Sequence, residues 1–172
     1  MSITKKILLT TALLVFLGGV FLFHEIFSGD VEHRESMPRS EATNWNWISF
    51  PLVDSATNIF GYFHMTGINH SEEYIRLTVP KDDLVGQINL VTTNSRDPIS
   101  NRLFQYEKKN IDSSEIMSGP SLDWWDKPLL WWSPGKITNG FYVGNKDSGF
   151  YFGAYEIWVD QDTGTLFIFQ GD

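Results

Sequence analysis

The sequence predicts an α+β protein, in which an N-terminal transmembrane helix precedes a single domain with a mainly antiparallel sheet and one short helix packed on it. Three observations lead to this prediction. Residues 7–24 are uncharged and largely apolar. Strand-like alternation over 73–79 and three apolar, β-rich runs after residue 139 predict a sheet. A short helical pattern over 81–91 lies between these strand groups, which favours a helix on one face of an antiparallel sheet.

The apolar run predicts a membrane anchor. As a helix it would span about 27 Å at 1.5 Å per residue, close to the roughly 30 Å hydrocarbon core of a bilayer. Lys5 and Lys6 precede the run and Glu25 follows it, so the positive-inside rule places the first residues in the cytoplasm. We therefore predict that 1–27 form a cytoplasmic stub and single-pass signal-anchor in the inner membrane. The lipid bilayer would bind residues 7–27, and the C-terminal domain would be periplasmic or extracellular.

A cleaved signal peptide is the alternative for this segment. Signal peptides have an apolar core of about 7–15 residues and end in a small-x-small cleavage site. The apolar run here is longer, and Ile26 stands two residues before the one candidate cleavage position, Ser28. The sequence therefore favours a retained anchor over a cleaved one.

The next segment, 28–44, is polar and lacks periodicity, which predicts a linker with a solvated His33. The folded domain is predicted to comprise 45–172, long enough for one hydrophobic core. Its first residues, 45–53, alternate Trp45 and Trp47 with other side chains before a proline. This pattern fits an edge strand or an extended segment.

A hairpin is predicted next. Residues 57–66 are aromatic and extended, a turn follows at Gly67 and Asn69, and 73–79 alternate strictly. One face of the second strand carries apolar side chains and the other carries Tyr74 and polar neighbours, so we expect that second face to be wet.

The predicted helix covers 81–91. Two acids stand in its first turn, where the helix dipole favours them. Leu84, Ile88 and Val91 then recur at helical spacing and form one apolar stripe.

The C-terminal third predicts an antiparallel meander. Its strands are 140–146, 149–160 and 165–169, and turn-forming residues join them. The second turn, Asp160–Gly164, shares its D-x-D-x-G spacing with the opening of a calcium loop. Because a glycine replaces the next oxygen ligand and no closing glutamate follows, the sequence favours a tight turn.

The charge balance excludes some partners. The chain has 13 basic and 21 acidic residues. Removing Lys5, Lys6, Glu25 and Asp30 leaves 11 and 19 over residues 31–172, again a net charge of −8. Such a domain repels phosphate backbones, so no nucleic-acid partner is expected. The chain has no cysteine, which excludes thiol catalysis and thiolate metal sites, and no cofactor is expected.

Tryptophan pairs are the candidate binding residues. Aromatic residues make up 15% of the chain, and seven are tryptophans. Trp124, Trp125, Trp131 and Trp132 lie in a segment rich in proline and glycine, where exposed indoles would stack on sugar rings. The competing interpretation is that neighbouring indoles point in opposite directions, with one of each pair in the core.

No catalytic or metal-binding constellation is evident, and we expect a protein that is not an enzyme. His64 and His70, with Glu72 and Glu73 nearby, match no established zinc-ligand spacing. Asp123 and Asp126 would serve a hydrolase only if both faced one cleft. No nucleophile elbow or phosphate-binding glycine loop is present.

Four stretches carry a family resemblance: FPLVDSATNI, EYIRLTVPKDDL, LDWWD and WVDQDTGTLFIF. Together they resemble a class of small bacterial envelope proteins with one N-terminal span and a domain that ends in D-x-x-T-G-x-hydrophobic. The resemblance implies a fold and a location, and no activity.

The expected function is that of a non-catalytic protein-binding or accessory module, such as an immunity protein. An acidic surface suits a basic envelope protein as the partner. A glycan-binding module is the alternative, and a hydrolase of envelope polymers is the third reading.

Overall fold

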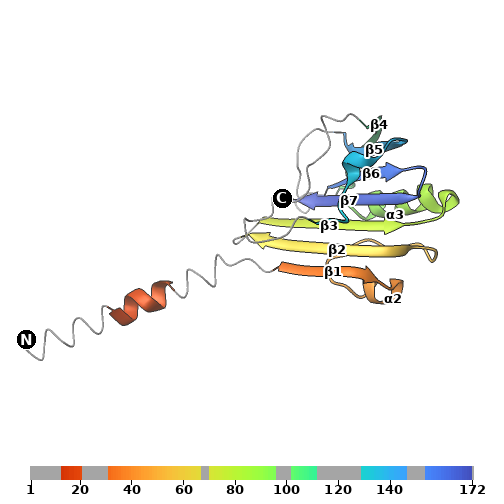
Figure 1. Cartoon of the computed structure of the whole chain (residues 1–172). Coiled ribbons are helices and arrows are strands. Elements are labelled where there is room, and N and C mark those ends of the chain that lie inside the picture. The colour runs from red at the N-terminus through yellow and green to blue at the C-terminus, as the bar shows by residue number, and fades with distance from the viewer. Residues whose placement is uncertain are drawn as a thin grey trace, which may run out of the picture.

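The computed structural model describes residues 13–20, 31–66, 70–95, 102–111, 129–146 and 154–171. These residues build a seven-stranded sheet (Figure 1). The strands are β1 (Val31–Met37), β2 (Thr57–Thr66), β3 (His70–Thr78), β4 (Tyr106–Asn110), β5 (Gly140–Asn145), β6 (Tyr155–Asp160) and β7 (Thr165–Gly171). The helical elements after residue 30 are α2 (Arg39–Ala42), η1 (Lys81–Asp83), α3 (Leu84–Asn94) and η2 (Pro134–Lys136).

The sheet has the order β1-β2-β3-β7-β6-β5-β4, and every neighbouring pair is antiparallel. The predicted β2–β3 hairpin and β5–β6–β7 meander are confirmed. The two groups join where β3 pairs with β7, with Ile75 opposite Ile168. The mainly antiparallel sheet predicted from the sequence is therefore present.

The segment predicted as a linker contributes a strand and a helix. Within 28–44 the structure has β1, which pairs with β2 from Val31 opposite His64, and then α2. The register shifts between Arg34 and Met37, where Ser36 has a φ of 54°. β1 is a polar edge strand, exposed over most of its length. The folded part therefore begins at β1, earlier than the predicted start at residue 45.

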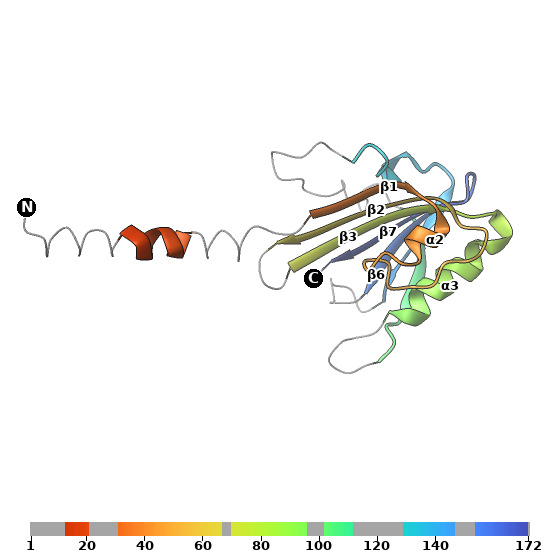
Figure 2. The ribbon, with the colours of Figure 1, turned by 90° about the horizontal axis from the view of Figure 1, so that it is seen from below.

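The predicted helix over 81–91 is confirmed as η1 followed by α3, with Leu84, Gln87 and Val91 buried. The edge strand considered for 45–53 is absent: these described residues have turns and irregular backbone. They cross the same face of the sheet as α2 and α3 (Figure 2). The segment covers the core as a loop, with Trp45 in the core and Trp47 packed against it.

The prediction of an N-terminal transmembrane helix needs correction. The described residues of the predicted anchor are 13–20, and they are helical. No helix among the described residues is long and apolar enough to cross a membrane. The predicted signal-anchor and single-pass location in the inner membrane, with a periplasmic or extracellular domain, are therefore unsupported. A span would need a helix long and apolar enough to cross the roughly 30 Å hydrocarbon core, and the described residues contain none.

Both faces of the sheet are covered. The face under α2 and α3, here called the helix face, carries the larger apolar core; its members include Ile59, Phe63, Ile75, Leu77, Val91, Ile157, Val159, Leu166 and Ile168. The other face, here called the aromatic face, carries Tyr62, Tyr74, Trp131, Trp132, Trp158, Phe167 and Phe169. The expectation that β3 has one wet face is wrong at Tyr74, which is buried under this second layer.

The turn between β6 and β7 is a tight turn, as predicted. Asp160 Oδ1 accepts hydrogen bonds from the backbone N–H groups of Asp162 (2.9 Å) and Thr163 (3.3 Å). Gly164 has a φ of 70°, and a Cβ there would collide with the carbonyl oxygen of Val79. Glycine is therefore required at this position both for its backbone angle and for its lack of a side chain.

Candidate functional site

The structure places two of the four predicted binding tryptophans inside the aromatic face. Trp131 and Trp132 are each 7% exposed. The Trp132 ring meets the rings of Tyr74 (centroids 4.9 Å apart), Phe167 (5.6 Å) and Trp158 (5.9 Å) edge to face. Their buried rings leave little surface for stacking on a sugar.

Four residues named in the sequence-based predictions lie outside the described residues: Trp124, Trp125, Asp123 and Asp126. Sugar binding by the first two and hydrolysis by the last two stay predictions.

Trp131 holds β1 to the aromatic face. Its indole N–H donates to Nε2 of His33 at 3.2 Å, and the two rings stack with centroids 6.3 Å apart. Trp131 also packs on Phe60, at 5.6 Å between centroids. His33 therefore helps to dock the segment around Trp131, whereas the sequence predicted a solvated side chain in a linker.

Trp47 performs the matching role on the helix face. Its ring stacks on Phe63 with centroids 3.4 Å apart, and its indole N–H donates to Oε2 of Glu32 at 2.7 Å. This hydrogen bond is the main reason that the pKa of the Glu32 carboxyl is lowered. The edge strand β1 is thus held from both sides.

An arginine stands in the middle of the aromatic face. Arg76 on β3 lies in register between Phe60 on β2 and Phe167 on β7. Its guanidinium carbon is 4.9 Å from the centroid of the Phe60 ring. Beyond this cation–π contact, the structure shows no hydrogen bond or ion pair for Arg76 among the described residues, and its buried Nε lacks an acceptor.

Trp132 presents a second donor of this kind. Its Nε1 is buried and lacks an acceptor among the described residues. A buried donor without a partner costs about 1–3 kcal/mol, more when it is charged. Two such donors on one face are therefore a feature that folding alone does not favour, and they are suited to receiving an acceptor from a ligand.

Polar side chains also cross the helix face, at the end of the sheet where β2 turns into β3. Glu73, Gln170 and Tyr155 stand in register on β3, β7 and β6. On the outer strands Tyr106 faces Asn145, and the Tyr106 hydroxyl accepts from the backbone N–H of Tyr155 at 3.0 Å.

Two serines from the segments that cover the helix face form hydrogen bonds with the tyrosines of this row. Tyr106 donates to Ser95 Oγ at 2.7 Å, next to the end of α3, and the hydroxyl of Tyr155 is hydrogen-bonded to that of Ser49. The bonds of Tyr106 and Tyr155 thus tie the covering segments to the sheet.

The raised pKa values of three tyrosines lead us to expect that the protein is less stable at alkaline pH. Burial raises the pKa of Tyr74, Tyr155 and Tyr106, whereas an unfolded tyrosine ionises near pH 10. The unfolded chain then releases protons that the native chain keeps, so the stabilisation present below about pH 10 is lost as the pH rises further. We expect tyrosinate absorbance and circular dichroism to change together above that pH.

Tyr155→Phe provides the control, since it removes one raised group and should make stability fall less steeply with pH. Ionisation of all six tyrosines at an ordinary midpoint, with native circular dichroism retained, would contradict the expected coupling.

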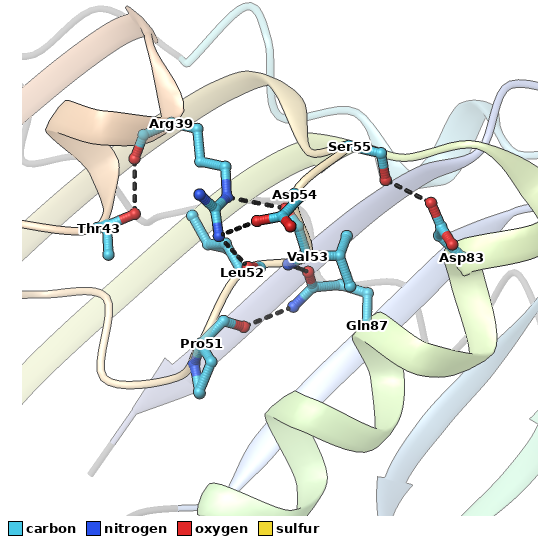
Figure 3. A network of polar contacts seen from close by, with 9 residues as sticks. All are labelled: Arg39, Thr43, Pro51, Leu52, Val53, Asp54, Ser55, Asp83 and Gln87. Atoms are coloured by element: carbon cyan, nitrogen blue, oxygen red, sulfur yellow. Dashed lines mark hydrogen bonds and ion pairs between the residues drawn. The ribbon is translucent and has the colours of Figure 1, made fainter.

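On the outside of the helix face, a surface segment is held rigidly between α2 and α3 (Figure 3). Arg39 of α2 donates to the carbonyl oxygens of Val53 (3.0 Å) and Leu52 (2.9 Å). The same guanidinium pairs with Asp54, at 2.8 Å between Nη2 and Oδ1. Arg39 thereby fixes the segment 51–55 from one side.

From the other side, α3 holds the same segment through Gln87, which is fully buried. Its side-chain oxygen accepts from the backbone N–H of Val53 (2.9 Å), and its amide donates to the carbonyl oxygen of Pro51 (3.1 Å). Ser55 donates to Oδ2 of Asp83 at 2.5 Å. Every one of these contacts uses a polar side chain to order a loop.

The segment brings three acids together at one end of the helix layer. We call Asp54, Asp82 and Asp83 the acidic ledge. Asp54 is 98% exposed at its side chain, and Asp82 is also exposed. Val85, next along α3, is exposed as well. The ledge therefore presents carboxylates on an ordered backbone, with an exposed apolar side chain beside it.

The described part of the chain shows no metal site. No group of three or more His, Asp or Glu side chains there could hold a metal ion. His64 stands opposite Glu72 in the register of β2 and β3, and the side chain of His70 is not described.

Comparison with known proteins adds no relative. No family model, no curated protein and no solved structure matches this chain. The resemblance to small bacterial envelope proteins stays a prediction.

Proposed function

We propose that this chain is a non-catalytic protein-binding module of the accessory or immunity type, and that the acidic ledge contacts a basic protein. The observation that carries the proposal is the ordering of segment 51–55 by Arg39 and the buried Gln87. Surface loops that a rigid scaffold positions are the usual carriers of function. A carboxylate on a fixed loop loses little conformational entropy on binding, which favours affinity.

Charge supports the same reading. The net charge of −8 raises the rate at which a basic partner arrives, since long-range attraction steers association. Two basic residues lie near the ledge. Arg39 is bound to the loop, and Lys81 precedes Asp82 in the sequence.

The test compares two variants of the full chain that lose the same charge. Asp54→Asn with Asp82→Asn neutralises the ledge. Glu35→Gln with Glu107→Gln removes two acids from the edge strands β1 and β4. Partners captured from extracts of the source cells with the wild-type chain would be identified and their affinities measured. We expect the ledge variant to bind about two- to thirtyfold more weakly, since each of the two exposed ion pairs contributes roughly 0.2–1 kcal/mol.

The edge-strand variant is the control, because it reports the loss of general attraction alone. Equal losses in both variants would contradict a contact at the ledge. Recovery of the chain without any partner at native abundance would contradict the proposal as a whole.

A further inference from the structure

The arginine at the centre of the aromatic face lacks the partner that its chemistry calls for. Arg76 is flanked in register by Phe60 and Phe167, and its Nε is buried without an acceptor among the described residues. A guanidinium carries five N–H donors in a planar fork. The guanidinium carbon lies over the Phe60 ring, a contact that uses none of the N–H donors as a hydrogen bond.

Tryptophan side chains stand on either side of this arginine. Trp131 packs over Phe60, and Trp132 packs over Phe167. Trp132 is 7% exposed, its Nε1 is buried without an acceptor among the described residues, and its ring belongs to the same aromatic face. One charged donor and one neutral donor therefore occur together within an aromatic surround.

Hydroxyl groups border the arginine on the same face of the sheet. Thr78 follows Arg76 by two residues along β3, and Thr165 stands opposite it on β7, with their Oγ1 atoms 3.4 Å apart. Hydroxyls both donate and accept, so they extend the polar part of this surface toward the end of the strands.

We propose that Arg76 and Trp132 form a recognition site for a carboxylate ligand with a flat, apolar body. The planar carboxylate matches the guanidinium fork in a two-bond contact, and the indole N–H supplies a third bond. Aromatic side chains exclude water, which strengthens these bonds and suits an aromatic acid over a small aliphatic one. A single negative charge loses less hydration on entering this layer than a doubly charged phosphate does.

This site is separate from the proposed protein-binding surface. Arg76 and Trp132 lie on the aromatic face, whereas the acidic ledge lies on the helix face. Loss of one function would therefore leave the other intact.

Titration of the full chain with benzoate tests the proposal. The indole N–H resonance of Trp132, identified by its disappearance in Trp132→Phe, is followed by nuclear magnetic resonance. We expect saturable movement of this resonance and one benzoate bound per chain by calorimetry. Acetate should bind more weakly than benzoate, and inorganic phosphate should bind more weakly still.

Arg76→Gln should weaken benzoate binding by about tenfold or more, because both charge and fork are lost. Arg76→Lys keeps the charge and loses the fork, so an intermediate loss is expected even if the glutamine variant fails to fold. Arg34→Gln, on the edge strand β1, removes the same charge elsewhere and should bind benzoate as the wild type does.

Three results would overturn the assignment: a Trp132 resonance that stays fixed at saturating benzoate, equal binding by Arg76→Gln and Arg34→Gln, or tighter binding of phosphate than of benzoate.

Discussion

Gly61→Ala is expected to remove a large part of the stability of the fold, because the Trp45 indole occupies the space that the new methyl group needs. A Cβ on Gly61 would lie within the ring, against Cζ3 and Cη2. Trp45 is buried in the core of the helix face, so it must leave that core or push the cover away from β2. Displacing a buried tryptophan costs about as much as truncating it, roughly 3–5 kcal/mol, against the 5–15 kcal/mol that holds a typical domain together.

A double-mutant cycle isolates this collision. Trp45→Ala alone leaves a cavity, but Gly61→Ala adds little to it because the ring is gone. We therefore expect the two changes to be strongly non-additive in urea denaturation. Gly86→Ala is the control, since a Cβ there meets nothing within 4 Å and alanine is favoured over glycine in α3 by about 0.5–1 kcal/mol. Additive losses would show that Gly61 matters for its backbone alone.

The parts of the fold that the sequence predicts well are those encoded by neighbouring residues. The β2–β3 hairpin, the helix after Pro80 and the β5–β6–β7 meander each follow from alternation, helical spacing or turn residues. The turn at Gly164 was predictable for the same reason. The pairing of β3 with β7 joins distant segments, and no local pattern encodes it.

β1 was missed because its sequence lacks the signal on which strand prediction depends. An edge strand has one neighbour and water on its other side, so polar residues such as Glu32, His33 and Arg34 are tolerated along its length. Its register also shifts before Met37, which breaks any alternation. The contacts that hold it, from Trp47 and Trp131, come from far along the chain.

The candidate carboxylate site was hidden by a reasonable but wrong reading of β3. Arg76 alternates with Ile75 and Leu77, which is the pattern of a strand with one wet face. The cover around Trp131 and Trp132 shows that this face is dry at Tyr74, whereas Arg76 and Thr78 are partly exposed. The two indoles both face the layer because residues 130 and 131 form a turn, whereas in a strand neighbours would point apart. The sequence did identify these tryptophans as candidates, but for stacking at the surface.

The apolar N-terminal run shows the opposite failure. Its composition satisfied the criteria for a span, yet no helix among the described residues is long and apolar enough to cross a membrane. Hydropathy measures how well each residue tolerates lipid, and it leaves the length of the helix undetermined.

Trp158→Ala should destabilise the aromatic face more than any other single truncation there. Trp158 is 1% exposed and stands between Phe167 and Tyr142 in the sheet, with the Trp132 ring edge-on above it. Removing its ring deletes contacts with all three and leaves a cavity that backbone strands cannot close. The expected loss in urea denaturation is about 3–5 kcal/mol, with near-ultraviolet circular dichroism reduced because the neighbouring indole loses its fixed environment.

The same substitution connects packing with binding. If Trp132 loses its support, its N–H no longer has a fixed direction, so benzoate should bind more weakly even to the chains that remain folded. Trp158→Phe fills part of the cavity and should recover part of both losses. Leu130→Ala changes a side chain that is 89% exposed on the same cover and should shift stability by less than about 0.5 kcal/mol. A Trp158→Ala protein as stable as Leu130→Ala would mean that the cover is held from elsewhere, and that the ring contacts beneath it contribute little.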